Sequence, residues 1–142
     1  QLDVNNTLRI YSTPSYWNGF VYMGAVGSNL RAYQLTNGQL TQTSLSTTIF
    51  QRNGQKGRGP IPVVSANGAS EGIVWTVEYT LSNTLILHAY DGTNLANELY
   101  TTQQNAARDA LGSGAVFAVP TVIDGRVYVV AVNQLNVYGL LP

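Results

Sequence analysis

One short sequence pattern occurs three times in the chain at a constant spacing. Residues 19–23 read GFVYM, residues 72–76 read GIVWT and residues 125–129 read GRVYV, so the offset is 53 residues both times. Each copy continues into a second apolar segment, and these segments end at Tyr33, Tyr90 and Tyr138. A fixed period of about 50 residues indicates supersecondary units that bury their apolar faces against each other. The chain is therefore predicted to consist of three structural repeats.

Turn-forming residues divide each repeat into short strands. A proline precedes every copy, and its fixed φ and missing N–H suit the edge or the first residue of a strand. These prolines are Pro14, Pro62 and Pro120. Asn-Gly at 18–19 and Asp-Gly at 124–125 are typical of hairpin turns. The middle copy has extra residues at 67–71, which are predicted to form a longer loop.

Further turn signals follow the second strand of the first two copies. They stand at residues 36–38 and 91–93, and Asp91 is predicted to form its turn through a side-chain bond to the backbone. Candidate fourth strands follow at 39–46 and 95–102. A unit is therefore predicted to be a meander of four strands.

The strands at 20–23 and 126–130 are almost wholly apolar. This pattern indicates inner strands that are covered on both faces.

A period of about 50 residues per four strands is typical of β-propeller blades, whose ring arrangement removes long exposed edges. We predict an all-β fold of three such blades, at about residues 12–47, 60–102 and 116–142, forming a partial propeller or half of an oligomeric ring. The third blade lacks a fourth strand. Residues 7–12, or another chain, are predicted to supply it.

Composition narrows the classes of partner and cofactor. Seven basic side chains balance seven acidic ones, so no net charge attracts nucleic acid or an anionic membrane surface. No apolar run approaches the roughly 20 residues of a membrane helix. The absence of cysteine excludes disulfides, iron–sulfur clusters and thiolate zinc sites. Few charges among many Thr, Ser, Asn and Tyr favour a secreted or periplasmic protein.

A family resemblance rests on three features of these repeats. They are the P-x-x-x-x-G-x-V-Y-V pattern at 120–129, Ala-Tyr before a turn at 32–33 and 89–90, and V-Y-G-L-L at 137–141. The chain resembles the quinoprotein-like β-propellers with pyrroloquinoline-quinone-like repeats, in particular the C-terminal blades of secreted bacterial members. The resemblance covers nearly the whole chain and implies fold more than function.

The chain also departs from the quinone-dependent enzymes of that group. Their blades carry a tryptophan-docking motif, and neither Trp17 nor Trp75 stands at the position it implies. Their vicinal disulfide is excluded by the absence of cysteine. No cofactor is therefore predicted. Since a propeller has at least four blades, the chain is a piece of a longer polypeptide, one of two copies that pair into a ring, or completed by another chain.

Two glycine- and amide-rich connections, at 50–60 and 101–114, are candidate ligand sites. Both join an outer strand to the next blade, so they are predicted to emerge on one face near the channel. Arg52, Arg58 and Arg108 could there bind an anionic or sugar ligand. The alternative is that these segments are solvated connections or that an arginine pairs with a neighbouring blade.

Aromatic side chains at Tyr16 and Trp17 form a second candidate site. They could stack on a sugar, and the alternative is a packed corner of the blade. His88 is the only histidine, and a single imidazole cannot by itself build a metal or general-base site, so a structural or surface role is expected. No catalytic or metal-binding residues are predicted.

The function that these observations favour is a non-catalytic binding or assembly module that associates with itself or with further blades, and that takes a carbohydrate or small polar ligand at the channel-face loops. Two alternatives remain open from the sequence. One is a degenerate quinone- or sugar-oxidising propeller enzyme. The other is a purely structural part of a larger propeller.

Overall fold

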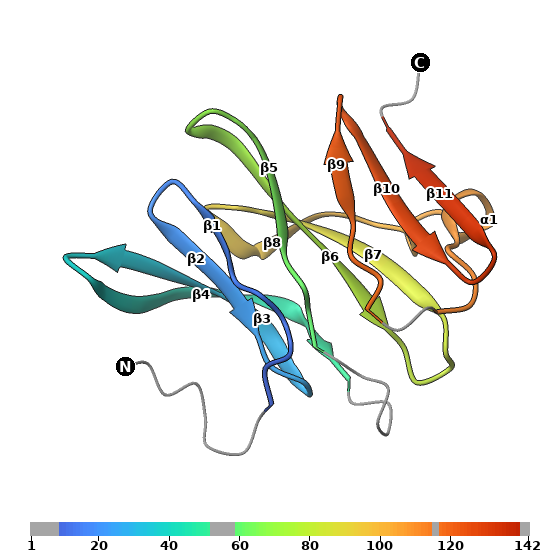
Figure 1. Cartoon of the computed structure of the whole chain (residues 1–142), viewed down its shortest axis with the longest axis horizontal. Coiled ribbons are helices and arrows are strands. Elements are labelled where there is room, and N and C mark those ends of the chain that lie inside the picture. Colours follow the sequence, from blue (N-terminus) through green and yellow to red (C-terminus); the bar gives the residue numbers. More distant parts are fainter. Residues whose placement is uncertain (1–8, 52–58, 115–116, 140–142) are drawn as a thin grey trace.

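Three antiparallel sheets, of four, four and three strands, follow one another along the chain (Figure 1). This computed structural model describes residues 9–51, 59–114 and 117–139. Each sheet is a simple meander in which strands adjacent in sequence are hydrogen-bonded neighbours. The prediction of an all-β fold made of three meander repeats is confirmed.

The first sheet contains β1 (Ser15–Trp17), β2 (Phe20–Gly24), β3 (Ser28–Thr36) and β4 (Gln39–Phe50). The turn between β1 and β2 has positive φ at both central residues, 44° at Asn18 and 83° at Gly19. Such turns match the twist of the strands they join, and asparagine and glycine adopt them at low cost. The predicted hairpin at 18–19 is confirmed.

The second sheet contains β5 (Val63–Asn67), β6 (Ser70–Tyr79), β7 (Leu85–Asp91) and β8 (Asn94–Thr101). The prediction of a longer loop at 67–71 is wrong. Asn67 pairs directly with Ser70, so a tight two-residue turn joins the strands, and Glu71 has a φ of 56° next to a shift in register. The extra residues lengthen the hairpin and form a bulge because strand pairing continues through them.

The third sheet contains β9 (Thr121–Ile123), β10 (Arg126–Ala131) and β11 (Gln134–Tyr138), and the short helix α1 (Ala106–Asp109) lies in the connection before it. Asp124 and Gly125 form the predicted hairpin turn, with φ of 49° and 69°. Within the described ranges no helix is long and apolar enough to cross a membrane.

The third sheet has no fourth strand among the described residues. Residues 9–12 are not in a strand, and the Arg9 carbonyl accepts a hydrogen bond from the Val26 N–H, 3.0 Å away, beside the first sheet. The described part of the 7–12 segment therefore does not complete the third sheet within this chain. Its completion by another chain stays a prediction.

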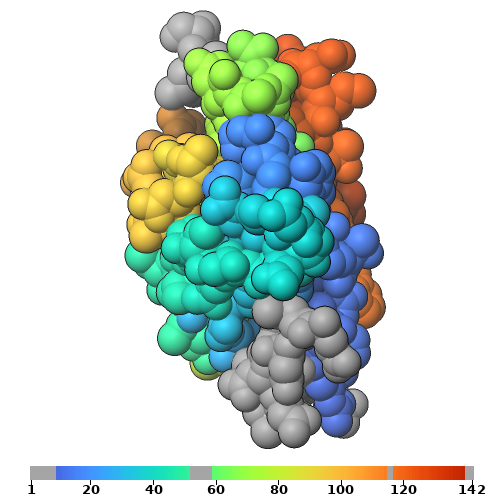
Figure 2. Space-filling model, turned by 90° about the vertical axis from the view of Figure 1, so that its left-hand side faces the viewer, coloured from blue at the N-terminus to red at the C-terminus, as the bar shows by residue number. Residues whose placement is uncertain are grey.

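The three sheets stack in sequence order, and the same side of each faces the next. Tyr22 of the first sheet packs in one apolar cluster with Val74 of the second. Trp75, which is 53 residues after Tyr22, packs in the other cluster with Val127 of the third, 53 residues after Val74. Figure 2 views this stack from the side of the first sheet, which is coloured blue to cyan. The repeated sequence thus produces two interfaces of the same sense.

Among the described residues, no other sheet covers the outer face of the third sheet. Val130 is 55% exposed, and Ile123, Leu135 and Val137 are exposed beside it. The prediction that residues 126–130 are covered on both faces is wrong for this chain. The strand instead alternates, with Val127 and Val129 buried toward the second sheet, because within the described part of the chain only one side of the third sheet packs against another sheet.

Candidate functional site

The candidate site arises where one repeat departs from the other at the same position of the sheet. In the first sheet Trp17 of β1 pairs with Phe20 of β2. In the second sheet the residue 53 places after Phe20 is Ile73, and it pairs with Ser65 of β5. Strand pairing therefore places Ser65 at the position that Trp17 occupies one sheet earlier.

Trp17 fills the outer part of the interface between the first and second sheets. It is 9% exposed, and its Nε1 donates a hydrogen bond to the Gly68 carbonyl at 2.8 Å. The indole lies over Gly72 and Gly92 so closely that a Cβ on Gly72 would be 2.4 Å from a ring carbon. Glycine at both positions therefore leaves the space that the ring occupies, and this interface is closed.

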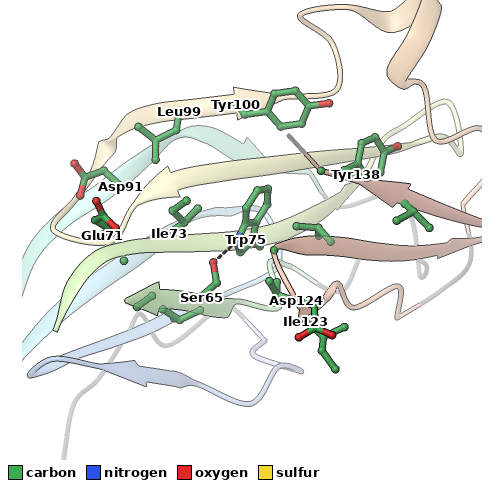
Figure 3. Close-up of a pocket in the computed structure, with 18 of the residues that line it drawn as sticks. Ser65, Glu71, Ile73, Trp75, Asp91, Leu99, Tyr100, Ile123, Asp124 and Tyr138 are labelled. Atoms are coloured by element: carbon green, nitrogen blue, oxygen red, sulfur yellow. Dashed lines mark hydrogen bonds between the residues drawn. The ribbon is translucent and has the colours of Figure 1, made fainter. Parts of the chain in front are cut away.

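Ser65 is too small to do the same between the second and third sheets. A cleft of about 1650 Å³ lies there instead (Figure 3). Its walls come from strands of both sheets and from the segment around α1. The cleft therefore lies at the position that Trp17 fills in the interface between the first and second sheets.

Three aromatic side chains line the cleft. Trp75 donates from Nε1 to Ser65 Oγ at 2.8 Å, so the small residue that leaves the space also orients the indole. Tyr100 and Tyr138 lie with their ring centroids 6.5 Å apart and their planes tilted by 55°. In Figure 3 the two tyrosines lie at one end of the cleft and Trp75 lies at its centre. The cleft thus offers flat apolar surfaces of fixed orientation.

Asp109 holds the tyrosine end of the cleft together. Its Oδ2 accepts a hydrogen bond from the Tyr100 hydroxyl at 2.8 Å, and its backbone carbonyl accepts one from the Tyr138 hydroxyl at 2.8 Å. Arg108 donates to both carboxylate oxygens, from Nε at 2.5 Å and from a terminal nitrogen at 2.7 Å. The side chain of Asp109 is buried by these partners. Because β8, α1 and β11 meet at Asp109, contacts within the chain fix the positions of the two rings.

The protonation states at this end follow from the same contacts. The hydrogen bonds from Arg108 and Tyr100 lower the pKa of Asp109, although its burial opposes this. Burial, together with the negative charge of Asp109, raises the pKa of Tyr138 to about 12. At neutral pH the carboxylate is charged and the Tyr138 hydroxyl keeps its proton.

Carboxylates outnumber cations along the cleft. Glu71, Asp91, Asp109 and Asp124 line it, against the single guanidinium of Arg108, which leaves four minus one, or three, uncompensated negative charges. Asp91 accepts hydrogen bonds from the backbone N–H and the hydroxyl of Thr93, at 2.8 and 2.7 Å, and these bonds lower its pKa. The prediction that Asp91 forms its turn is confirmed.

Of the three arginines predicted to bind a ligand, the structure describes only Arg108. Arg108 lies in the cleft, but its guanidinium is paired with Asp109, as in the alternative of an arginine that makes an internal contact. Arg52 and Arg58 lie outside the described residues. The prediction that the two connections emerge on one face therefore stays a prediction. No ring of arginines is therefore described.

Tyr16 and Trp17 do not form an exposed stacking pair. Successive residues of a strand point to opposite faces, so Trp17 is buried toward the second sheet and Tyr16, 64% exposed, lies on the other side. Trp17 therefore has the packed environment that the sequence left open as the alternative to sugar stacking, whereas Tyr16 is exposed. Sequence reasoning missed Ser65, Trp75, Tyr100 and Tyr138, whose common location depends on strand pairing.

His88 lies in the closed interface and has a structural environment. It is 4% exposed, with Nδ1 2.6 Å from Glu98 Oε1 and Nε2 3.3 Å from Glu78 Oε2. Burial lowers the pKa of His88, but the hydrogen bonds with the two glutamates outweigh that effect, so its pKa is raised. Phe50 of β4 packs edge-on against the imidazole. In the described part of the chain no group of three or more His, Asp or Glu is arranged to hold a metal ion.

Comparison of the chain with protein-family models, with curated proteins and with solved structures gives no match.

Proposed function

We propose that the chain is a non-catalytic binding module that takes an oligosaccharide into the cleft between its second and third sheets. The observation that carries the proposal is the replacement of Trp17 by Ser65 at the equivalent position, which leaves an aromatic-walled cleft where the neighbouring interface is filled. The proposal keeps the ligand class predicted from the sequence and moves its site from the connecting loops to this cleft.

The chemistry of the walls suits a neutral carbohydrate. The C–H faces of a sugar ring pack on aromatic rings, which Trp75, Tyr100 and Tyr138 supply. The hydroxyl groups of a sugar donate hydrogen bonds to carboxylate oxygens, which Glu71 and Asp124 supply at the rim. Ligand sites combine large apolar surfaces with a few oriented polar groups in this way.

Size and charge narrow the class further. The volume of about 1650 Å³ exceeds the range of roughly 300–1,000 Å³ typical of small-molecule sites, so there is room for more than one sugar ring. Three uncompensated negative charges oppose an anionic ligand. A neutral oligosaccharide is the class that meets both conditions.

We further propose that the three sheets are blades of a β-propeller. The support for this is that each sheet presents the same side to the next, so that successive interfaces repeat. A regular rotation between such units produces a ring when enough of them are present. The cleft would then be a gap between two adjacent blades.

The test is titration calorimetry with neutral gluco- and manno-oligosaccharides of two to six units, beside a sulfated oligosaccharide and a polyamine. We expect binding of at least one neutral series. In Ser65→Trp the new indole fills the cleft, and we expect affinity to fall by roughly tenfold or more. Ser65→Thr keeps the hydroxyl that accepts the hydrogen bond from Trp75 and adds only one methyl group, so it is the matched control, with affinity expected within about threefold of the wild type.

Circular dichroism and thermal unfolding establish that both variants are folded before they are compared. If only the polyamine bound, the ligand would be cationic, and the proposed ligand class of neutral oligosaccharides would be wrong. Equal affinity in Ser65→Trp and the wild type would remove the cleft as the site, and absence of binding to every probe would contradict the proposal as a whole.

A further inference from the structure

The outer face of the third sheet is an apolar surface at one end of the stack. Strand pairing places Ile123, Tyr128, Val130, Leu135 and Val137 on this side, opposite to the side that contacts the second sheet. Ile123 and Val137 also line part of the cleft. Four of the five are exposed large hydrophobic residues. We call these five residues the end face. Arg126, which pairs with Ile123, adds one charged side chain on the same side. Exposed apolar residues that gather on one side of a sheet in this way are typical of an interaction site.

We propose that the end face binds the outer side of the first sheet of a second copy of this chain, head to tail. The two interfaces inside the chain are both made in this way. The side that carries Tyr22 in the first sheet contacts the second, and the side that carries Trp75 in the second contacts the third. Tyr128, a further 53 residues on, lies on the same side of the third sheet, and no sheet formed by the described residues packs against that side. The end face therefore continues the internal interfaces.

The first sheet presents the matching side at Gly19 and Leu35, whereas Tyr33 on the same side is already buried within the chain, at 2% exposed. Inside the chain, Trp17 packs over Gly72 and Gly92 of the next sheet, and the Gly92 N–H donates to the Gly72 carbonyl at 2.8 Å. In the first sheet the Leu35 N–H donates to the Gly19 carbonyl at 2.7 Å, so Gly19 and Leu35 are the equivalents of the two glycines. They have no tryptophan above them: a Cβ on Gly19 would meet nothing within 4 Å, and Leu35 is 41% exposed.

The side chains at this position are also complementary in size. Ile123 pairs with Arg126 as Trp17 pairs with Phe20, so Ile123 is the end-face counterpart of Trp17. Inside the chain a large indole packs over glycine. Between copies a smaller isoleucine would pack over a leucine. The loss of volume on one side is compensated by the gain on the other, which preserves close packing.

Head-to-tail contacts either close into a ring or continue as a filament. Two copies would bring six sheets together, which lies within the range of four to eight known for propellers. In such a ring each copy supplies the end face of one contact and the first sheet of the other. We infer a closed dimer with two identical contacts.

The mass of the purified chain in solution tests the dimer. Light scattering coupled to size exclusion is expected to give about twice the 15.3 kDa of one chain. Leu135→Arg places a charge in the end face and is expected to yield single chains. The matched control is Ala96→Arg, which adds the same charge on an exposed position of β8 and is expected to leave the dimer intact. A wild-type chain of single mass, or a control that dissociates equally, would overturn the proposal.

A second experiment tests the direction of the contact. Leu35→Arg changes only the receiving side and is also expected to yield single chains. Mixing Leu35→Arg with Leu135→Arg leaves one unmodified contact per pair, so heterodimers are expected to form from two variants that are each monomeric. If Leu35→Arg alone remained fully dimeric, two end faces would be binding each other and the head-to-tail arrangement would be wrong.

Discussion

The two internal interfaces use the same faces of equivalent sheets, yet one is filled and the other contains a cleft. Between the first and second sheets, Trp17 covers two glycines and its N–H is hydrogen-bonded. Between the second and third, Ser65 stands at that position and three aromatic rings border an open space. The comparison teaches that the side chain at this one position distinguishes an interface that is filled from one that contains a cleft.

The largest effect is expected from opening the closed interface. Trp17→Ala removes the indole from above Gly72 and Gly92, and large-to-small changes of buried aromatic residues cost about 3–5 kcal/mol of unfolding free energy. Urea denaturation followed by circular dichroism measures the change. Tyr16→Ala alters the adjacent, exposed ring and is expected to cost far less. Equal losses in the two variants would show that Trp17 has no special part in the interface.

A smaller effect is expected from adding one methyl group under the same ring. Gly72→Ala would place its Cβ 2.4 Å from Trp17, and overpacking of this kind costs about 1–3 kcal/mol. In Gly139→Ala the nearest atom is 3.6 Å from the new Cβ, so the unfolding free energy is expected to change by less than about 0.5 kcal/mol. When Trp17→Ala is already present, the cost of Gly72→Ala should largely disappear. A cost that persists would locate the strain elsewhere.

The polar part of the closed interface predicts a pH dependence of stability. Because the pKa of His88 is raised in the folded state, its contribution is fully present below the unfolded pKa of roughly 6.5 and is lost as pH rises through the folded pKa. The hydrogen bond from His88 lowers the pKa of Glu98, although burial opposes this, so that contribution is present above roughly pH 4.3 and is lost as pH falls through the folded pKa. Stability should therefore be highest between these limits.

Urea denaturation at a series of pH values from about 5 to 9 checks this expectation. Since His88 is the only histidine of the chain, a decline in unfolding free energy above neutral pH can be compared directly with His88→Gln. The variant keeps a hydrogen-bond donor but does not titrate, so the decline should be absent from it. An identical decline in both proteins would assign the pH dependence to other groups.

Local sequence signals predicted the strands and most of the turns correctly. Asn18-Gly19 and Asp124-Gly125 were identifiable because a two-residue hairpin needs positive φ at both positions, which is a property of the turn itself. The segment at 67–71 was misjudged because its extra residues could lengthen either a loop or the strands. Because Asn67 pairs with Ser70, these residues lengthen the strands.

The candidate site was less accessible to sequence reasoning. The constant offset of 53 residues matches Trp17 with Ser70, whereas strand pairing matches it with Ser65, because the extended hairpin intervenes between them. Arg108 was recognised as a candidate from its loop, but its pairing with Asp109 and the meeting of Tyr100 and Tyr138 at that residue depend on β8, α1 and β11 lying together.

The sequence by itself determined that the chain is an all-β protein of three meander repeats, because alternation, turn residues and a fixed period act over a few residues or recur at regular intervals. Only the tertiary structure decided that Trp17 is buried while Tyr16 is exposed, that Ser65 leaves a cleft, and that the hydrophobic residues of the end face are exposed. These outcomes depend on which face of each sheet meets the next. That choice is made by contacts between residues about 50 positions apart, and it is not encoded in any one repeat.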